Sequence, residues 1–296
     1  MTHHRVQPAT VRGGRATTHC GLSGSRAGYG ARCRHRASLP ALFLPRPDTN
    51  PRCTICSMTK NALQDSFGNS DWLRSLLDTS PATELSLTAI ADFLESDSAL
   101  LAHEKFLFIS AISAVKGRES DTRHWMARSL KSGLAPEAAR HAAALMLLSR
   151  GIEVSRLMLL AIPFDGSSPS TDRTPLASPP SSEIFEYFTQ VFGQLPDRIT
   201  LLADHAPAAL AYYYLLRKAG LEVGALQPRL SELMLVAINA AECQRDYVRI
   251  HADGALKKGA NEAQLVEACV CAIPFSGVAA WFPASEAILS LRTSGT

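Results

Sequence analysis

The stretch SELMLVAINAAECQRDYVRIHADGALKKG, Ser231 to Gly259, contains the features that decide how this sequence folds. Its first part carries apolar side chains at helical spacing, and its second part carries polar side chains at the same spacing. Glu232 lies 19 residues before His251, which is followed by Ala255 and Gly259 at intervals of four. We therefore expect two consecutive helices, with a carboxyl group on the first and an imidazole on the second.

The chain after Met58 shows the same helical pattern throughout, with apolar residues at i, i+3, i+4 and i+7. Segments with this pattern are DWLRSLLD (71–78), LTAIADFL (87–94), EKFLFISAISAV (104–115), EAARHAAALMLL (137–148), EIFEYFTQVF (183–192), DRITLLADH (197–205), AALAYYYLLRKAG (208–220) and EAQLVEACVCAI (262–273). No segment alternates as a half-buried strand does, so the sequence predicts an all-α fold. The longest apolar runs fall short of the ~20 residues that a spanning helix needs, so we expect no membrane segment.

A stretch rich in Pro, Ser and Gly, DGSSPSTDRTPLASPPSS, interrupts the helical pattern between Asp165 and Ser182. Such a composition is typical of a linker. We expect a linker at residues 166–181 between two helical halves, residues 58–165 and 182–296.

The two halves resemble each other at an offset of 126 residues. This offset places Pro81 on Pro207 and Gly133 on Gly259, and a two-residue slip between these points pairs Glu104 with Glu232. A repeat of this size indicates duplication of one helical unit, with each copy burying a face against the other.

Residues 1–57 differ from the rest of the chain. They contain nine Arg, no Lys and one acidic residue, a net charge of +8, whereas the remaining 21 basic and 26 acidic residues give −5. The segment is Gly-rich and lacks hydrophobic periodicity, so we expect a disordered extension, or a true start at Met58, rather than a packed domain. An organelle transit peptide is the less favoured alternative. The acidic body argues against a nucleic-acid partner.

The Glu–His spacing, together with LPDRITLLADHAPAALAYYYLL before it and NEAQLVEACVCAIPFSG after it, resembles the carboxymuconolactone decarboxylase and alkylhydroperoxidase D superfamily. The resemblance covers residues 195–290 well and 70–160 weakly. It implies two AhpD-like helical bundles in one chain. It also implies assembly into a homo-oligomer, for which we expect a trimer of two-repeat chains.

The peroxidase branch of this superfamily uses a helix of the form Cys-x-x-Cys-x-x-x-His. Counting back from His251, the two cysteine positions are Gln244 and Tyr247, and neither is Cys. Cys243 is one residue away, about 100° around a helix from the first position. The usual disulfide cycle is therefore not available, and Cys243 remains a candidate thiol for a peroxidase that works with a single cysteine.

The decarboxylase branch relies on acid–base chemistry, and the resemblance implies neither a metal nor an organic cofactor. On one helix Gln244, Tyr247 and His251 share a face, with Glu232 contributed by the preceding helix. An imidazole beside a carboxylate can take up and release protons near neutral pH. We expect His251 and Glu232 to act on a small carboxylated substrate that Tyr247 or Gln244 orients, and Arg249 to lie in solvent on another face.

A structural interpretation competes with the catalytic one, because a Glu and a His inside a bundle can simply bond each other and fix helix packing. In the first half, Trp125 is the counterpart of His251, and an indole cannot transfer protons as an imidazole does. We therefore expect the first half to have a structural role. Three hypotheses follow: a decarboxylase-like lyase, lactone-processing enzyme or isomerase, a thiol peroxidase, or a non-catalytic scaffold.

Other cysteines and tyrosines have simple expected roles. We expect Cys269 and Cys271 to be small core residues. Tyr212, Tyr213 and Tyr214 point in different directions on a helix, so at least one ring should be buried and one exposed. The three Cys of the body provide no disulfide framework, which favours a cytoplasmic location.

Overall fold

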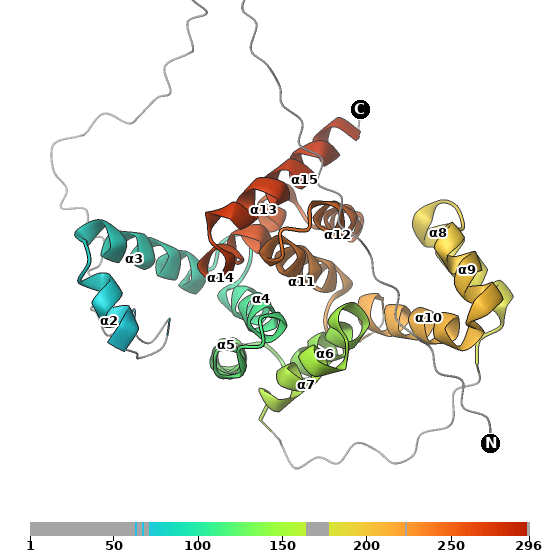
Figure 1. Ribbon diagram of the computed structural model, residues 1–296, viewed down its shortest axis with the longest axis horizontal. Coiled ribbons are helices and arrows are strands. Elements are labelled where there is room, and N and C mark those ends of the chain that lie inside the picture. Colours follow the sequence, from blue (N-terminus) through green and yellow to red (C-terminus); the bar gives the residue numbers. More distant parts are fainter. Residues whose placement is uncertain (1–62, 64–66, 68–70, 164–177, 223, 295–296) are drawn as a thin grey trace, which may run out of the picture. The chain divides into compact units, whose positions relative to one another are not determined.

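The computed structural model describes residues 63, 67, 71–163, 178–222 and 224–294. These residues form helices and their connections and contain no strand, which confirms the all-α prediction (Figure 1). The extension expected at 1–57 and most of the linker expected at 166–181 lie outside the described residues. None of the helices in the described part of the chain has the length and hydropathy needed to cross a bilayer.

The described helices before the linker all lie between residues 71 and 160. They are α2 (Asp71–Leu77), α3 (Pro81–Glu95), α4 (Ala102–Val115), α5 (Glu119–Lys131), α6 (Pro136–Arg150) and α7 (Ile152–Leu160). The helices after the linker are α8 (Ser181–Phe192), α9 (Asp197–His205), α10 (Pro207–Leu221), α11 (Pro228–Ala241), α12 (Arg245–Lys257), α13 (Glu262–Val270), α14 (Ile273–Ser276), the 3₁₀ turn η1 (Val278–Ala280) and α15 (Trp281–Ser294).

Proline is the first residue of four of these helices, at Pro81, Pro136, Pro207 and Pro228. The fixed φ of proline suits the first helical turn, where its missing N–H has no partner in any case. Periodicity alone does not predict the first residue of each helix, because it shows only which face of the helix is apolar.

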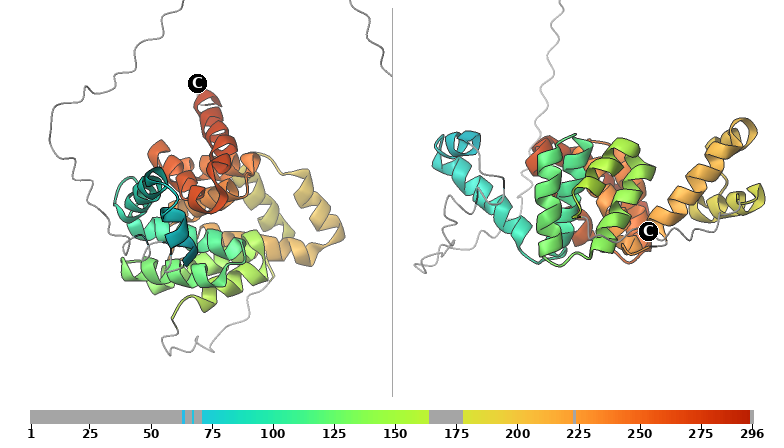
Figure 2. Two further views of the ribbon diagram at one scale, coloured as in Figure 1. Left: turned by 60° about the vertical axis from the view of Figure 1, so that its left-hand side comes forward. Right: turned by 90° about the horizontal axis from the view of Figure 1, so that it is seen from below.

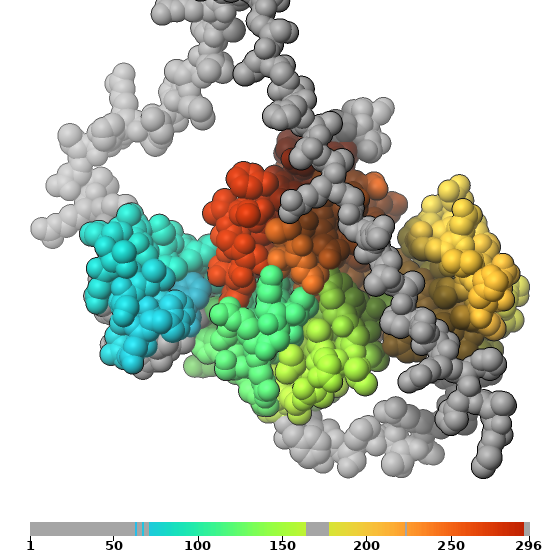
Figure 3. All heavy atoms as spheres, in the orientation of Figure 1, coloured from blue at the N-terminus to red at the C-terminus, as the bar shows by residue number. Residues whose placement is uncertain are grey.

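The helices α4 and α11 lie side by side at the centre of the molecule (Figure 1). Nearly every residue of both is buried, as expected of helices that are apolar on all sides. Their side chains belong to one hydrophobic cluster that runs from Leu94 in the first half to Ile288 in the second. Figure 3 shows the side chains of the two halves in direct contact. The halves therefore share one core.

The helix boundaries recur at a constant spacing of 126 residues. The helices α4 and α11 begin at Ala102 and Pro228 and have equal lengths, and α5 and α12 follow at the same interval. The two-residue slip expected from sequence is therefore wrong, because no residue is inserted between these helix pairs. The counterpart of Glu232 is Phe106, and Glu104 lies instead in the first turn of α4, where it pairs with Arg229.

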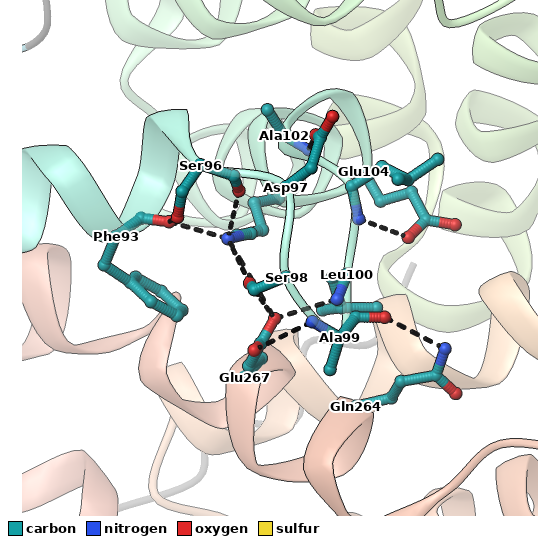
Figure 4. A network of polar contacts seen from close by, with 12 residues as sticks. Phe93, Ser96, Asp97, Ser98, Ala99, Leu100, Ala102, Glu104, Gln264 and Glu267 are labelled. Carbon is teal, nitrogen blue, oxygen red and sulfur yellow. Dashed lines mark hydrogen bonds and ion pairs between the residues drawn. The ribbon is translucent and has the colours of Figure 1, made fainter.

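Two polar side chains hold each half onto the other at equivalent places. In the second half the Glu267 carboxylate accepts hydrogen bonds from the backbone N–H groups of Ala99 (3.1 Å) and Leu100 (2.8 Å), in the loop between α3 and α4 (Figure 4). In the first half, His141 accepts a hydrogen bond from the N–H of Leu226 (2.9 Å), in the loop between α10 and α11. Leu100 and Leu226 are 126 residues apart, so the contacts are reciprocal.

The loop before α4 also surrounds a buried lysine. The Lys105 ammonium donates to the carbonyl oxygens of Phe93 (2.6 Å) and Ser96 (2.7 Å) and to the Ser98 hydroxyl (2.9 Å). Burial lowers the pKa of this lysine, and the nearby Glu267 carboxylate opposes that effect. With all three protons bonded, Lys105 has a structural role.

A smaller apolar cluster joins α8, α9 and α10 and consists of Ile184, Phe188, Ile199, Leu210 and Tyr214. Tyr214 is 2% exposed and Tyr212 is 55% exposed, which confirms that the three consecutive tyrosines point in different directions. Figures 1 and 2 show these three helices next to one another. This cluster positions the ends of α8 and α9 that form one wall of the site.

Candidate active site

The side chains of Glu232 and His251 meet where α11 and α12 pack together. The Nδ1 atom of His251 lies 2.8 Å from Oε2 of Glu232. The Glu232 side chain is 5% exposed and the His251 side chain 16%. The 19-residue spacing therefore places the acid and the imidazole in contact, across the hairpin of two helices.

A third charged group completes this contact. Lys258, just beyond the end of α12, donates from Nζ to Oε1 of Glu232 (3.1 Å) and to the carbonyl oxygen of Leu221 (2.8 Å). Sequence reasoning missed Lys258. A signal was present, because Lys258 follows His251 by seven residues and therefore lies on the same helical face.

The close approach of Glu232 to α12 depends on a glycine. A Cβ atom on Gly254 would lie 2.9 Å from the carboxyl carbon of Glu232, closer than such atoms can approach. The equivalent position in the first half is Arg128, where the facing residue is Phe106 instead of a glutamate.

The surroundings of Glu232 keep its carboxyl group ionised. Burial by itself would raise the pKa of Glu232, but the hydrogen bonds and positive charges of His251 and Lys258 outweigh burial and lower that pKa. An ionised carboxylate can only accept hydrogen bonds. Nδ1 of His251 must therefore carry a proton and donate it to Glu232. This leaves Nε2 as the ring nitrogen that can exchange a proton with a ligand.

The pair lies at the wall of a cavity of about 730 Å³. The wall is formed by the end of α8, the start of α9, the end of α10 and the second half of α12. Its lining residues are Gln190, Val191, Phe192, Gly193, Arg198, Arg217, Glu222, Glu232, Arg249, Ile250, His251, Asp253, Gly254, Lys257 and Lys258. The volume is within the range of small-molecule sites, and charged groups line much of the wall.

The structure does not bring the other predicted site residues to this cavity. Gln244 precedes the first residue of α12 as its N-cap, and Tyr247 is 55% exposed. Neither lines the cavity, which begins on α12 only at Arg249. Arg249 is exposed to solvent, as expected, but it is part of the cavity wall and does not lie on a face away from the site.

The cysteines also lie away from the cavity. Cys243 is exposed in the turn between α11 and α12, and it is not a lining residue. Cys269 and Cys271 are buried, as expected of core residues. Burial raises the pKa of Cys269 to about 12 and raises that of Cys271 as well, so neither thiol ionises near neutral pH. Among the described residues, no group of His, Cys, Asp and Glu is arranged to hold a metal ion.

The first half has an aromatic contact at the corresponding place. Phe106 and Trp125 stand where Glu232 and His251 stand, and their ring centroids are 5.6 Å apart. The Arg128 guanidinium lies over both rings, 4.5 Å and 5.2 Å from their centroids. Neither ring can transfer a proton between acid and base, so the first half lacks this chemistry.

Residues 207–289, from α10 into α15, match the family model of the carboxymuconolactone decarboxylase family. Helices α11 and α12 of the matched segment carry the Glu232–His251 pair, whereas α8 and α9, which complete the cavity wall, precede that segment.

One similar solved structure is a Burkholderia xenovorans chain described as a gamma-carboxymuconolactone decarboxylase subunit. It has 16% identity and a TM-score of 0.48 over 79% of this chain and 96% of that one. A likeness at this level says nothing about activity. The comparison with curated proteins gives no significant match.

Proposed function

We propose that this chain is a carboxymuconolactone decarboxylase-like enzyme that uses Glu232 and His251 for acid–base chemistry on a small carboxylated substrate. The observation that carries the proposal is an imidazole fixed by an ionised carboxylate at the wall of a cavity of about 730 Å³. Reactions within reach of this pair are decarboxylation, lactone processing and isomerisation. The group that transfers the proton is Nε2 of His251.

The proton transfer can be written for the two simplest cases. In a decarboxylation, the C–C bond to the carboxylate breaks, its electron pair stays on the substrate as an enolate, and protonated His251 donates a proton to that carbon as CO₂ leaves. In an isomerisation, His251 removes a proton beside a carbonyl and returns it to another carbon. Such catalysis contributes about 10²–10⁴ in rate. Glu232 accepts a hydrogen bond from Nδ1 and so orients the imidazole, and Lys258 holds the Glu232 carboxylate in place.

The first half has a structural role in this proposal. Residues 58–165 and 182–296 are taken as two repeats of one helical unit, an assignment that the constant spacing of helix starts supports. The first repeat fills the place that a second identical domain would take. A trimer of such chains and a cytoplasmic location belong to the same proposal.

The test is a set of variants incubated with a panel of small carboxylated substrates. The panel contains β-keto acids, carboxylated γ-lactones and their unsaturated isomers, and the readouts are CO₂ release and proton NMR in D₂O. We expect turnover of at least one compound by the wild type and a loss of about 10²-fold or more in His251→Gln, since its amide cannot act as acid or base.

Arg245→Gln is the matched control, because Arg245 is exposed on the same helix and does not line the cavity. It should keep wild-type rates. Equal rates for the wild type, His251→Gln and Glu232→Gln would contradict the proposal, as would a panel on which the wild type is inactive, and the scaffold hypothesis would then be favoured.

A further inference from the structure

The cavity has a second wall with its own chemistry, formed by α8, α9 and α10. Phe192 is the last residue of α8, and Gly193 turns the chain with a φ of 78° toward α9. The Phe192 ring stacks on the fully buried ring of Phe188, with centroids 6.1 Å apart. Phe192 is therefore held as a rigid surface at the cavity.

Two guanidinium groups lie over this ring. The Cζ atom of Arg198 is 4.8 Å from the centroid of Phe192, and that of Arg217 is 5.3 Å away. A guanidinium stacks well on an aromatic face and keeps its N–H groups free at its edge. Both arginines line the cavity. Two like charges on one ring repel each other, so this arrangement requires compensation.

In the described part of the chain, no ion pair supplies this compensation. Within the described residues, neither Arg198 nor Arg217 has a carboxylate at ion-pair distance. Many other arginines of the chain do have one. Arginines with such pairs include Arg123, Arg150, Arg156 and Arg292. The Nε atom of Arg217 is in addition buried without a hydrogen-bond partner.

The acidic groups that line the cavity have other partners. Glu222 accepts a hydrogen bond from Tyr187 (2.7 Å), and Asp253 pairs with Lys257 (2.8 Å). Glu232 is bound by His251 and Lys258. Arg217 also interacts with the Tyr187 phenol, but burial and Glu222 raise the pKa of that phenol, so it remains neutral. Since the neutral phenol leaves the charge of Glu222 in place, the wall has two arginines against one carboxylate and carries a net positive charge.

We propose that Arg198 and Arg217, held on Phe192, bind a carboxylate of the ligand and thereby determine which substrates the cavity accepts. This inference rests on the proposed function in placing the reacting carbon at His251, on the part of the wall formed by α12. The planar guanidinium matches a carboxylate in two-point contact. Phe192 and Arg198 precede the segment that matches the family model, whereas Arg217 lies within it, so this wall combines residues from both parts of the chain.

The experiment is titration calorimetry on the full chain with acetate, succinate, glutarate and adipate, and with inorganic phosphate as a different oxyanion. We expect saturable binding of at least one of the carboxylates, at an affinity that falls with added salt. Arg198→Gln and Arg217→Gln should each weaken it about tenfold, since a hydrogen-bonded charged contact is lost. Arg156→Gln, an exposed arginine away from the cavity, should bind as the wild type does.

Two further variants keep the test decisive if a Gln variant folds poorly. Arg198→Lys keeps the charge but lacks the planar fork, and Phe192→Leu keeps an apolar residue but removes the ring. Both should weaken carboxylate binding while circular dichroism shows an unchanged helix content. Unchanged affinity in these variants, absence of carboxylate binding by the wild type, or binding of phosphate alone would overturn the inference.

The two proposals fail separately in this experiment. His251→Gln should bind the carboxylates with wild-type affinity, because His251 lies on another wall. If the arginine variants bind normally but His251→Gln still loses turnover, the catalytic proposal stands without the carboxylate site. If the arginine variants lose binding but no variant affects turnover, the carboxylate site stands without the catalytic proposal.

Discussion

Single residues around Glu232 show how charge is accommodated in the core. Its carboxylate is almost fully buried, and it is stable there because His251 and Lys258 supply two hydrogen bonds and positive charge. Gly254 leaves the space that the carboxylate occupies. The catalytic proposal and part of the stability of the second half depend on this one side chain.

Replacing Glu232 by Gln should destabilise the protein in a pH-dependent way. The pKa of Glu232 is lowered from its ordinary 4.5 in the folded protein, so its ionised form stabilises the fold above that value. The contribution is lost as the pH falls through the lowered folded-state pKa. We expect a loss of about 3–5 kcal/mol at pH 7, typical of breaking a buried charged pair.

Urea denaturation of both proteins at pH 7 and near pH 3 measures this effect. The difference in unfolding free energy should shrink at the lower pH, because that pH is below the ordinary pKa of 4.5 at which the carboxyl group of the unfolded chain takes up a proton. A difference that is the same at both values would show that Glu232 is not ionised in the fold.

At the scale of elements, the turns that follow α4 and α11 have the same backbone with different residues. Gly117 ends the first with a φ of 70°, and Cys243 ends the second with a φ of 57°. Positive φ favours glycine because other residues place Cβ against the backbone. Cys243 is therefore in a strained conformation at a position where its equivalent is glycine.

Replacing Cys243 by Gly should leave the protein as stable or up to about 1 kcal/mol more stable, because relief of the strain exceeds the added entropy of the unfolded chain. The reverse change, Gly117→Cys, should cost about 1–2 kcal/mol. Thermal unfolding of the two variants measures both effects.

The same Cys243→Gly variant tests the thiol peroxidase hypothesis. Cys243 lies outside the cavity, and the other two described cysteines are buried. Carboxylate turnover should therefore persist in the variant. Hydroperoxide consumption by the wild type that disappears in Cys243→Gly would instead support the peroxidase.

At the scale of the whole molecule, the shared core makes the two halves interdependent. Buried side chains of α4 and α11 form one cluster, and Glu267 and His141 each hold a loop of the other half. The constant spacing of their helices identifies the two halves as repeats, but their buried side chains pack into one core. Separate folding units would need separate cores.

We expect a fragment of residues 178–296 to lack a stable monomeric fold, since the buried face of α11 would be exposed without α4. Circular dichroism and size-exclusion chromatography on the fragment, with residues 58–296 as the control, test this expectation. The fragment should be poorly helical or should associate with itself through the exposed face. A monomeric fragment that unfolds cooperatively would show that the halves fold independently.

Helical periodicity predicted most of the fold, because the apolar face of a helix repeats over a few residues and is visible locally. The contact between Glu232 and His251 could be anticipated from their spacing, since adjacent helices bring such positions together. The counterpart of Glu232 in the first half could not be identified from sequence, which paired it with Glu104. Only the helix boundaries show that this counterpart is Phe106.

The sequence by itself determined the all-helical class and the acid–imidazole contact, which depend on neighbouring turns of the chain. Only the tertiary structure decided which side chains share the cavity: it excluded Tyr247 and Gln244 and added Lys258, Arg249, Arg198 and Phe192. The physical reason is that the direction of a side chain follows from its own helix, whereas the wall it faces is supplied by helices distant in sequence, packed through a separate apolar cluster.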